Sequence, residues 1–212
     1  MSPLYAIIDV DVCVRAGRRP GDVAGAYLSG GVRLLQVRAK HLPGGALLQL
    51  VDEIAAAARD VGATVVVNDR VDVARTAGLG VHLGQDDLPV AAARAVLGPD
   101  AVVGLSTHTS AQLTEALGQP ITYVAYGPVF ATVTKTTADP VVGLAGLAAA
   151  AAAASAATVP LVAIGGITLA SAGAVRAAGA VSVAVISDLL AGPEGPAARA
   201  RRFLSALDVQ TV

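Results

Sequence analysis

One stretch of the chain decides the fold: it reads RLLQVR at residues 33–38, ALLQLVDEIAAAARDV at residues 46–61 and TVVVN at residues 64–68. The first and last segments are short apolar runs rich in Leu and Val, which is typical of strands buried on both faces of a parallel sheet. In the middle segment, apolar residues recur mostly three and four residues apart, as on one face of an amphipathic helix, at Leu47, Leu50, Val51, Ile54, Ala58 and Val61. Gly62 follows where a helix C-cap is expected. A strand, a helix and a strand in succession predict a βαβ unit.

The same alternation continues along the rest of the chain. Strands are predicted at Leu4–Asp9, Arg33–Arg38, Thr64–Asn68, Gly80–Leu83, Val102–Thr107, Thr122–Gly127, Leu161–Gly165 and Ser182–Ser187. Helices are predicted near 21–29, 46–61, 70–77, 89–97, 110–117, 144–157, 168–178 and 196–206, with Ser110 and Thr168 as N-caps. Eight alternations predict an α/β protein with a single (β/α)8 TIM barrel over residues 1–212; a doubly wound open sheet is the alternative.

The composition limits the classes of function. Of 212 residues, 54% are hydrophobic and 15% charged, and the formal net charge is −1. The high apolar fraction excludes a disordered chain, and the near-zero charge argues against nucleic acid or a membrane surface as partner. The start MSPLYAIIDVD has no basic region of the kind a signal peptide needs, no apolar stretch is long enough for a membrane span, and Cys13 has no second cysteine to pair with. We therefore expect a cytoplasmic protein.

Cationic side chains follow the second predicted strand. Because side chains alternate along a strand, QVRAK at residues 36–40 places Gln36, Arg38 and Lys40 on one face. An amide, a guanidinium and an ammonium group together suit a phosphorylated anion, and a solvated strand edge is the alternative. Lys40 and Lys135 are the only two lysines among the 15 basic residues.

Carboxylates follow the next two strands. Asp69 comes directly after the third strand, and the adjacent Asp86 and Asp87 come after the fourth. Carboxylates from neighbouring strand ends suggest Mg²⁺, held by few protein ligands so that phosphate oxygens and water complete its coordination. Helix capping is the alternative explanation for Asp69 and Asp87, because both precede predicted helices.

The remaining strand ends are less charged. Ser106 ends the fifth strand two residues before His108; it lies in no nucleophile elbow, so we interpret it as a hydrogen-bond donor to a ligand. His82, inside the fourth strand, is interpreted as a packed and hydrogen-bonded histidine. The absence of a His/Cys cluster argues against zinc.

The last three strands lead to loops that suit a second phosphate. A long polar segment, ATVTKTTADPVVG at residues 131–143, carries two hydroxyls and a lysine at Thr132, Thr134 and Lys135. Gly166 follows the seventh strand, and Ile186 and Ser187 end the eighth. The loops after strands 7 and 8, with a helix N-terminus, often bind phosphate in barrels, and a glycine would let the backbone approach it closely. Two ordinary tight turns are the alternative.

Taken together, these motifs resemble those of the thiamine phosphate synthase family. The segments QVRAK, NDRVD, GVHLGQDD, GLSTHT, YGPVFATVTKT, AIGGI and VAVIS occur in the family's order across residues 36–187. The resemblance implies a (β/α)8 barrel that joins 4-amino-5-hydroxymethyl-2-methylpyrimidine diphosphate to 4-methyl-5-(2-phosphoethyl)thiazole, giving thiamine phosphate and diphosphate. The turn before Val81 is one residue shorter than usual, so the second metal ligand is assigned to Asp87 rather than Asp86.

The resemblance also assigns roles to individual residues. It implies that the pyrimidine diphosphate binds to Gln36, Val37, Arg38, Ala39, Lys40, Asn68, Ser106 and Lys135. It implies that the thiazole phosphate binds to Thr132, Val133, Thr134, Gly166, Ile186 and Ser187, and that Asp69 and Asp87 hold Mg²⁺. The catalytic residues would be Arg38, Lys40, Ser106 and Lys135, which would stabilise the departing diphosphate without a protein nucleophile.

Two other functions are weighed against this one. A thiazole tautomerase-like isomerase shares the barrel and could use His108 as a base, but it generally lacks the two metal carboxylates. A non-catalytic regulator that binds a phosphorylated ligand would need neither those carboxylates nor paired lysines. The sequence leaves a homo-oligomer open.

Overall fold

The computed structural model describes residues 1–132 and 139–208 of the chain. Eight parallel strands form a closed barrel in sequence order, and the last strand pairs with the first. The strands are β1 Leu4–Asp9, β2 Leu34–Arg38, β3 Thr64–Asn68, β4 Gly80–Leu83, β5 Val103–Thr107, β6 Tyr123–Tyr126, β7 Leu161–Ala163 and β8 Ser182–Val185. The closed sheet confirms the barrel and excludes the open, doubly wound alternative.

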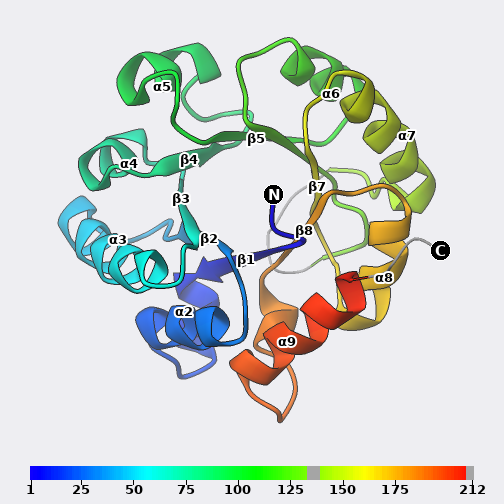
Figure 1. Cartoon of the computed structure of the whole chain (residues 1–212). Coiled ribbons are helices and arrows are strands. Elements are labelled where there is room, and N and C mark those ends of the chain that lie inside the picture. The colour runs from blue at the N-terminus through cyan, green and yellow to red at the C-terminus, as the bar shows by residue number, and fades with distance from the viewer. Residues whose placement is uncertain (133–138, 209–212) are drawn as a thin grey trace.

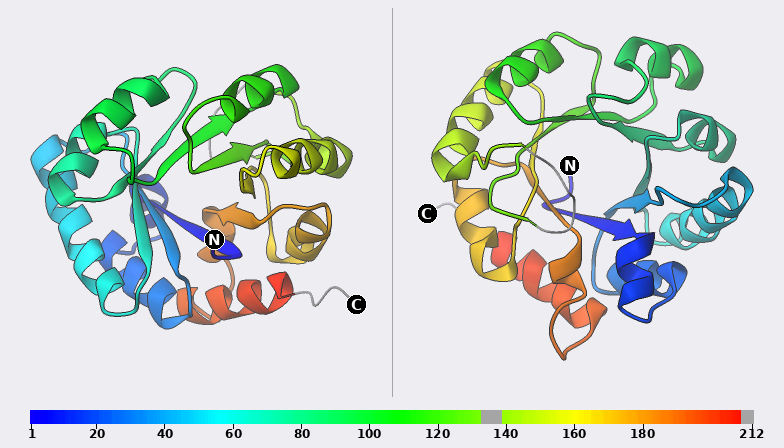
Figure 2. Two further views of the ribbon diagram at one scale, coloured as in Figure 1. Left: turned by 45° about the horizontal axis from the view of Figure 1, so that its top comes forward. Right: turned by 180° about the vertical axis from the view of Figure 1, so that it is seen from behind.

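Helices form a ring outside the strands (Figure 1). They are α1 Val10–Arg15, α2 Pro20–Ser29, α3 Gly44–Arg59, α4 Val71–Ala77, α5 Val90–Leu97, α6 Ser110–Leu117, α7 Gly143–Ala156, α8 Leu169–Ala177 and α9 Pro196–Leu207, with a 3₁₀ helix, η1, at Ser187–Leu189. The last helix, α9, packs against both α8 and α2 and so completes the ring, as the two views of Figure 2 also show. No helix in the described ranges is long and apolar enough to cross a membrane.

Several predicted boundaries need correction. The seventh strand ends at Ala163, two residues earlier than predicted, because Gly165 and Gly166 both have positive φ and turn the chain away. The eighth strand ends at Val185, also two residues early, since η1 begins at Ser187. The N-cap of α6 is Thr109, whose hydroxyl accepts the N–H of Gln112, and not Ser110. Thr168 caps α8 as predicted.

Two elements were not predicted: α1 and η1. The Asp9 side chain accepts a hydrogen bond from Val12 N at 3.0 Å and starts α1 immediately after β1. At only six residues, α1 is too short to show a helical repeat in the sequence. The predicted C-cap at Gly62 also shifts: α3 ends at Arg59, and Gly62 makes the left-handed turn just beyond it.

The apolar core has two layers, as expected for a barrel. The larger layer lies between the strands and the helices and includes Leu35, Val37, Ile54 and Phe203. The smaller fills the barrel itself, with side chains of Tyr5, Ile7, Leu34, Val66, Tyr123, Ala125, Val162 and Ala184. Because successive residues alternate between these layers, the polar residues at the carboxyl ends of the strands face the barrel mouth.

Candidate functional site

A charged rim lies at the carboxyl ends of β1–β4. Arg38, which ends β2, forms an ion pair and hydrogen bond with Asp9, which ends β1. Lys40 bonds in the same way with Asp69, which follows β3. The prediction that these side chains lie on one face of the strand is therefore confirmed. Gln36, Arg38 and Lys40 all contact residues of the barrel interior or mouth. The role of Asp9 was not predicted; its side chain is 3% exposed and pairs with the Arg38 guanidinium.

The two predicted metal carboxylates lie beside each other. Burial raises the pKa of Asp69, and a hydrogen bond and the negative charge from the Asp87 carboxyl raise it further, while Lys40 lowers it. Asp69 also has a φ of 63°, a left-handed conformation that is uncommon outside glycine and often found at functional sites. Asp69 thus combines a strained backbone with a neighbouring carboxylate that disfavours its ionisation.

Helix capping does not explain these carboxylates. The residues that precede α4 and α5 as N-caps are Arg70 and Pro89, and neither makes a side-chain cap. Asp87 instead accepts a hydrogen bond from Gly84 N at 2.6 Å, which turns it back toward β4. Asp86 is exposed, whereas Asp87 is half-buried. The contact with Asp69 favours Asp87 over Asp86.

Inside the barrel, uncharged polar side chains form a continuous hydrogen-bonded chain beneath the rim. The chain runs from Gln36 on β2 through Tyr5, Tyr123 and His82 to Ser106 on β5, and each link is 2.8 Å long. Every member is at most 7% exposed. The interpretation of His82 as a packed, hydrogen-bonded histidine is confirmed. The two tyrosines were missed because each sits in an apolar run that reads as core.

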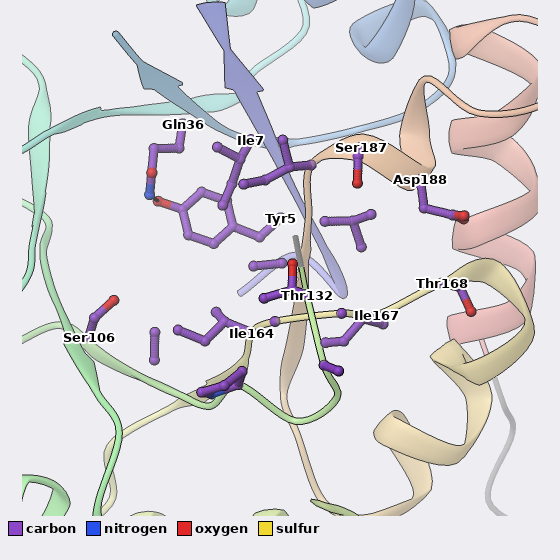
Figure 3. Close-up of a pocket in the computed structure, with 18 of the residues that line it drawn as sticks. Tyr5, Ile7, Gln36, Ser106, Thr132, Ile164, Ile167, Thr168, Ser187 and Asp188 are labelled. Carbon is purple, nitrogen blue, oxygen red and sulfur yellow. Dashed lines mark hydrogen bonds between the residues drawn. The ribbon is translucent and has the colours of Figure 1, made fainter. Parts of the chain in front are cut away.

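Next to this chain, a cavity of about 330 Å³ opens at the barrel mouth. Figure 3 shows Tyr5, Gln36 and Ser106 on one side of it, and Thr132, Ile164 and Ile167 on the other. Most of the lining is apolar or main chain, with residues from Ala125 to Thr132 and from Ile164 to Thr168 contributing one wall. A cavity with few polar groups suits a flat, largely apolar ring.

His108 also lines this cavity, and one of its ring nitrogens has a fixed hydrogen-bond partner. Its Nδ1 lies 2.6 Å from the carbonyl oxygen of Gly127, which can only accept. Nδ1 therefore donates this hydrogen bond. Asp139 lies on the same side of the ring, 3.6 Å from Nδ1.

Gly166, which follows β7, is needed for backbone packing within the protein, and its predicted contact with a phosphate stays a prediction. A Cβ on Gly166 would lie 2.5 Å from the carbonyl oxygen of Ala131 and 2.6 Å from that of Phe130. The missing side chain thus allows the segment after β6 to pack against the segment after β7, which Phe130 N and Gly165 O join by a 3.1 Å hydrogen bond. Among the described residues, no group accepts a hydrogen bond from the Gly166 N–H, so this donor is available to an anion in the cavity.

The N-terminus of α8 already holds a carboxylate. Asp188 accepts the N–H of Leu169 at 2.9 Å, and Arg199 of α9 donates to the same carboxylate oxygen at 2.7 Å. Asp188 therefore takes one N–H donor of this helix N-terminus, whose contribution to phosphate binding stays a prediction. Arg199 balances the Asp188 charge beside the cavity.

Comparison with known proteins agrees with this arrangement. The family model described as thiamine monophosphate synthase matches residues 4–189. The chain belongs to the thiamine monophosphate synthase family.

Individual relatives cover nearly all of the chain. A thiamine-phosphate synthase of Anaeromyxobacter dehalogenans is 47% identical over 92% of this chain and 85% of its own length. A bifunctional protein, ThiM/ThiE, of Symbiobacterium thermophilum is 46% identical over 95% of this chain, which spans 41% of that protein. A solved structure of thiamine phosphate pyrophosphorylase from Pyrococcus furiosus superposes with a TM-score of 0.85 at 28% identity, covering 96% of this chain and 94% of that one.

The structure divides the substrate-binding residues expected from the family resemblance into four groups. Side chains that face the rim or the cavity are those of Gln36, Arg38, Lys40, Ser106, Thr132, Ile186 and Ser187. Asn68 ends β3 beside His82 and is 7% exposed. The side chains of Val37 and Ala39 pack instead in the layer between strands and helices, so only their main chain can face a ligand. Val133, Thr134 and Lys135 lie outside the described residues.

Proposed function

We propose that this chain is a transferase that makes thiamine phosphate, joining the pyrimidine diphosphate to the thiazole phosphate and releasing diphosphate. The observation that carries the proposal is the contact of three carboxylates and two cations on the rim of the same barrel mouth that holds a largely apolar cavity. A diphosphate fits the rim, and two uncharged rings fit the cavity. The family assignment supports the same reaction.

The cations of the rim would stabilise the leaving group. The bond between the pyrimidine methylene carbon and the diphosphate oxygen breaks, and the diphosphate takes the electron pair. Arg38 and Lys40 are held in place by Asp9 and Asp69, so they would meet the developing charge without reorganising. The aminopyrimidine ring stabilises the methylene cation, and the thiazole nitrogen then forms the new bond to carbon.

The cavity would supply orientation and exclude water. Holding the two rings together converts a bimolecular step into an effectively unimolecular one. Its walls at Ile7, Ile164 and Ile167 offer no nucleophile that could capture the cation before the thiazole does. The Gly166 N–H, with the loop at Ile186 and Ser187, would hold the thiazole phosphate.

We propose Mg²⁺ as the cofactor, held by Asp69 and Asp87. The fit rests on the contact between these two carboxyls, since burial and mutual repulsion already disfavour their both being ionised. Within the described residues, no group of three or more His, Cys, Asp and Glu side chains could hold a metal, so the protein would supply only two ligands. That number suits Mg²⁺, which keeps open positions for phosphate oxygens and water and neutralises their charge.

The experiment that tests this function uses the purified chain, both phosphorylated rings and Mg²⁺. We expect release of diphosphate and formation of thiamine phosphate only when both rings are present. Isomerisation of the thiazole phosphate alone would indicate the tautomerase-like alternative. Binding of either ring without any reaction would indicate the regulator.

A further inference from the structure

In the buried chain of hydrogen bonds beneath the rim, the donor and the acceptor of each bond can be assigned. Tyr123 is its central member. A Cβ on Gly104 of β5 would lie 2.1 Å from Tyr123 Cζ, so the glycine leaves room for the Tyr123 ring inside the barrel. The ring stacks on His82, with centroids 5.6 Å apart, and meets Tyr5 edge-on at 87°. Packing thus fixes the hydroxyl of Tyr123 between Tyr5 and His82.

The direction in which the hydrogen bonds are donated follows from Gln36, the first member of the chain. Gln36 Nε2 can only donate, so the Tyr5 hydroxyl accepts there and gives its own proton to the Tyr123 hydroxyl. The Tyr123 hydroxyl must then donate to His82 Nδ1. A neutral His82 whose Nδ1 accepts carries its proton on Nε2, and Nε2 therefore donates to Ser106 Oγ. Every link then has one proton, and the hydroxyl proton of Ser106 is left over.

The proton count depends on the tyrosines staying neutral. Burial raises the pKa of Tyr5 and raises that of Tyr123 well above its ordinary value. Both hydroxyls thus keep their protons at neutral pH. Ser106, at 7% exposure, lines the cavity, so its remaining proton can reach a ligand there.

We propose that Gln36, Tyr5, Tyr123 and His82 are positioning residues that fix Ser106 as a hydrogen-bond donor to an acceptor atom of the substrate's uncharged heteroaromatic ring. The ring is favoured over the diphosphate because all five members of the chain are uncharged, whereas the cations lie on the rim. The identification of that ring as the aminopyrimidine rests on the proposed function. The direction of the chain does not.

This direction also explains why Ser106 is no nucleophile. A base that activated the serine would have to accept its proton at Nε2 of His82, but that nitrogen is the donor. His82 therefore cannot activate Ser106 as it would in a hydrolase, and the serine hydroxyl can instead donate a hydrogen bond to a ring nitrogen.

Nitrogen NMR of the histidines tests the direction without any turnover. The chain has three histidines, and the signals of His82 are assigned by their loss in His82→Asn. In the wild-type protein we expect His82 to be neutral, with the proton on Nε2. In Gln36→Glu at alkaline pH, the new carboxylate can only accept, so every link reverses and the proton moves to Nδ1. A wild-type proton on Nδ1, or no change in Gln36→Glu, overturns the proposal.

Kinetics then test whether the direction matters to the substrate. The matched control is Gln36→Met, which removes the first donor without supplying an acceptor. We expect Gln36→Glu to raise KM for the pyrimidine diphosphate about tenfold more than Gln36→Met does, the loss of about one hydrogen bond. In a Ser106→Ala background the difference between Glu and Met should vanish, because the hydroxyl through which it acts is gone. Equal effects of Glu and Met, or a difference that persists without Ser106, contradict the proposal.

The experiments distinguish a failure of the proposed function from a failure of the hydrogen-bond direction. A wild-type chain that releases no diphosphate from the two rings overturns that function, and the tautomer of His82 still decides the direction of the chain. A wild-type chain that turns over but carries the Nδ1 proton on His82 overturns the direction alone.

Discussion

Over β1–β4 the barrel mouth presents charged side chains, whereas over β6–β8 it presents main chain and apolar side chains. In the charged half, each cation contacts a carboxylate: Arg38 contacts Asp9, and Lys40 contacts Asp69. In the neutral half, charged groups are fewer: Asp188 of the cavity lining pairs with Arg199, and His108 lies 3.6 Å from Asp139. The difference indicates a division of labour, in which one half would bind and release a diphosphate and the other would orient a ring and its phosphate.

Removal of the metal ion should give the largest effect, and it concerns the charged half alone. We expect EDTA to reduce synthesis by more than about a thousandfold, because both the metal's charge and its contact with the leaving group are lost. Added Mg²⁺ should restore the rate. Undiminished synthesis in the presence of the chelator would remove the metal from this account.

Loss of the buried guanidinium should come next. Arg38→Met should lower kcat about a hundredfold or more, as expected when a charge-stabilising donor is removed. Arg75→Met, on the exposed face of α4, is the matched control for loss of one positive charge and should keep the wild-type rate. Comparable losses in both variants would mean that net charge, and not position, accounts for the effect.

A substitution in the neutral half should weaken binding of the thiazole phosphate rather than binding of the pyrimidine diphosphate. Arg199→Met leaves the Asp188 carboxylate unbalanced beside the cavity, and repulsion should raise KM for the thiazole phosphate about tenfold or more. KM for the pyrimidine diphosphate should change little. The double variant Asp188→Asn, Arg199→Met should recover most of the loss, since it removes the repelling charge; a double variant as impaired as the single would indicate damage to the loop instead.

The charged half was largely predictable from the sequence, and the neutral half was less so. Charged residues are few in this chain, so Arg38, Lys40, Asp69 and Asp87 were conspicuous at strand ends. The neutral half depends on which backbones pass close to each other, as at Gly166, and a glycine pair in a sequence does not say what lies against it.

The buried polar chain shows another limit. Tyr5 and Tyr123 read as core because they occur in apolar strands, and they are indeed buried. Only the register of the closed barrel brings their hydroxyls together with His82, across 118 and 41 residues of sequence. One signal was available: Gly104, in the middle of a strand, indicates that something bulky packs against it.

A smaller effect should appear in the free energy of unfolding. It tests whether the Asp69 carboxylate serves the reaction at the expense of the stability of the fold. Asp69→Asn should raise the free energy of unfolding of the metal-free protein by about 0.5–1 kcal/mol, because it removes a disfavoured charge and because Asn tolerates positive φ. Thermal unfolding in EDTA should show an increase in Tm of about 2–4 °C. The same variant should lose its synthesis; a lower Tm would mean that the Lys40 contact outweighs the repulsion.

The most direct measurement of the division between the two halves is diphosphate release by the wild-type chain with Mg²⁺, given each ring separately and then both together. We predict release with both rings in amounts equal to the thiamine phosphate formed, and little release with the pyrimidine diphosphate alone. No release with both rings, or equal release whether or not the thiazole phosphate is present, would contradict a charged half and a neutral half that act together on two substrates.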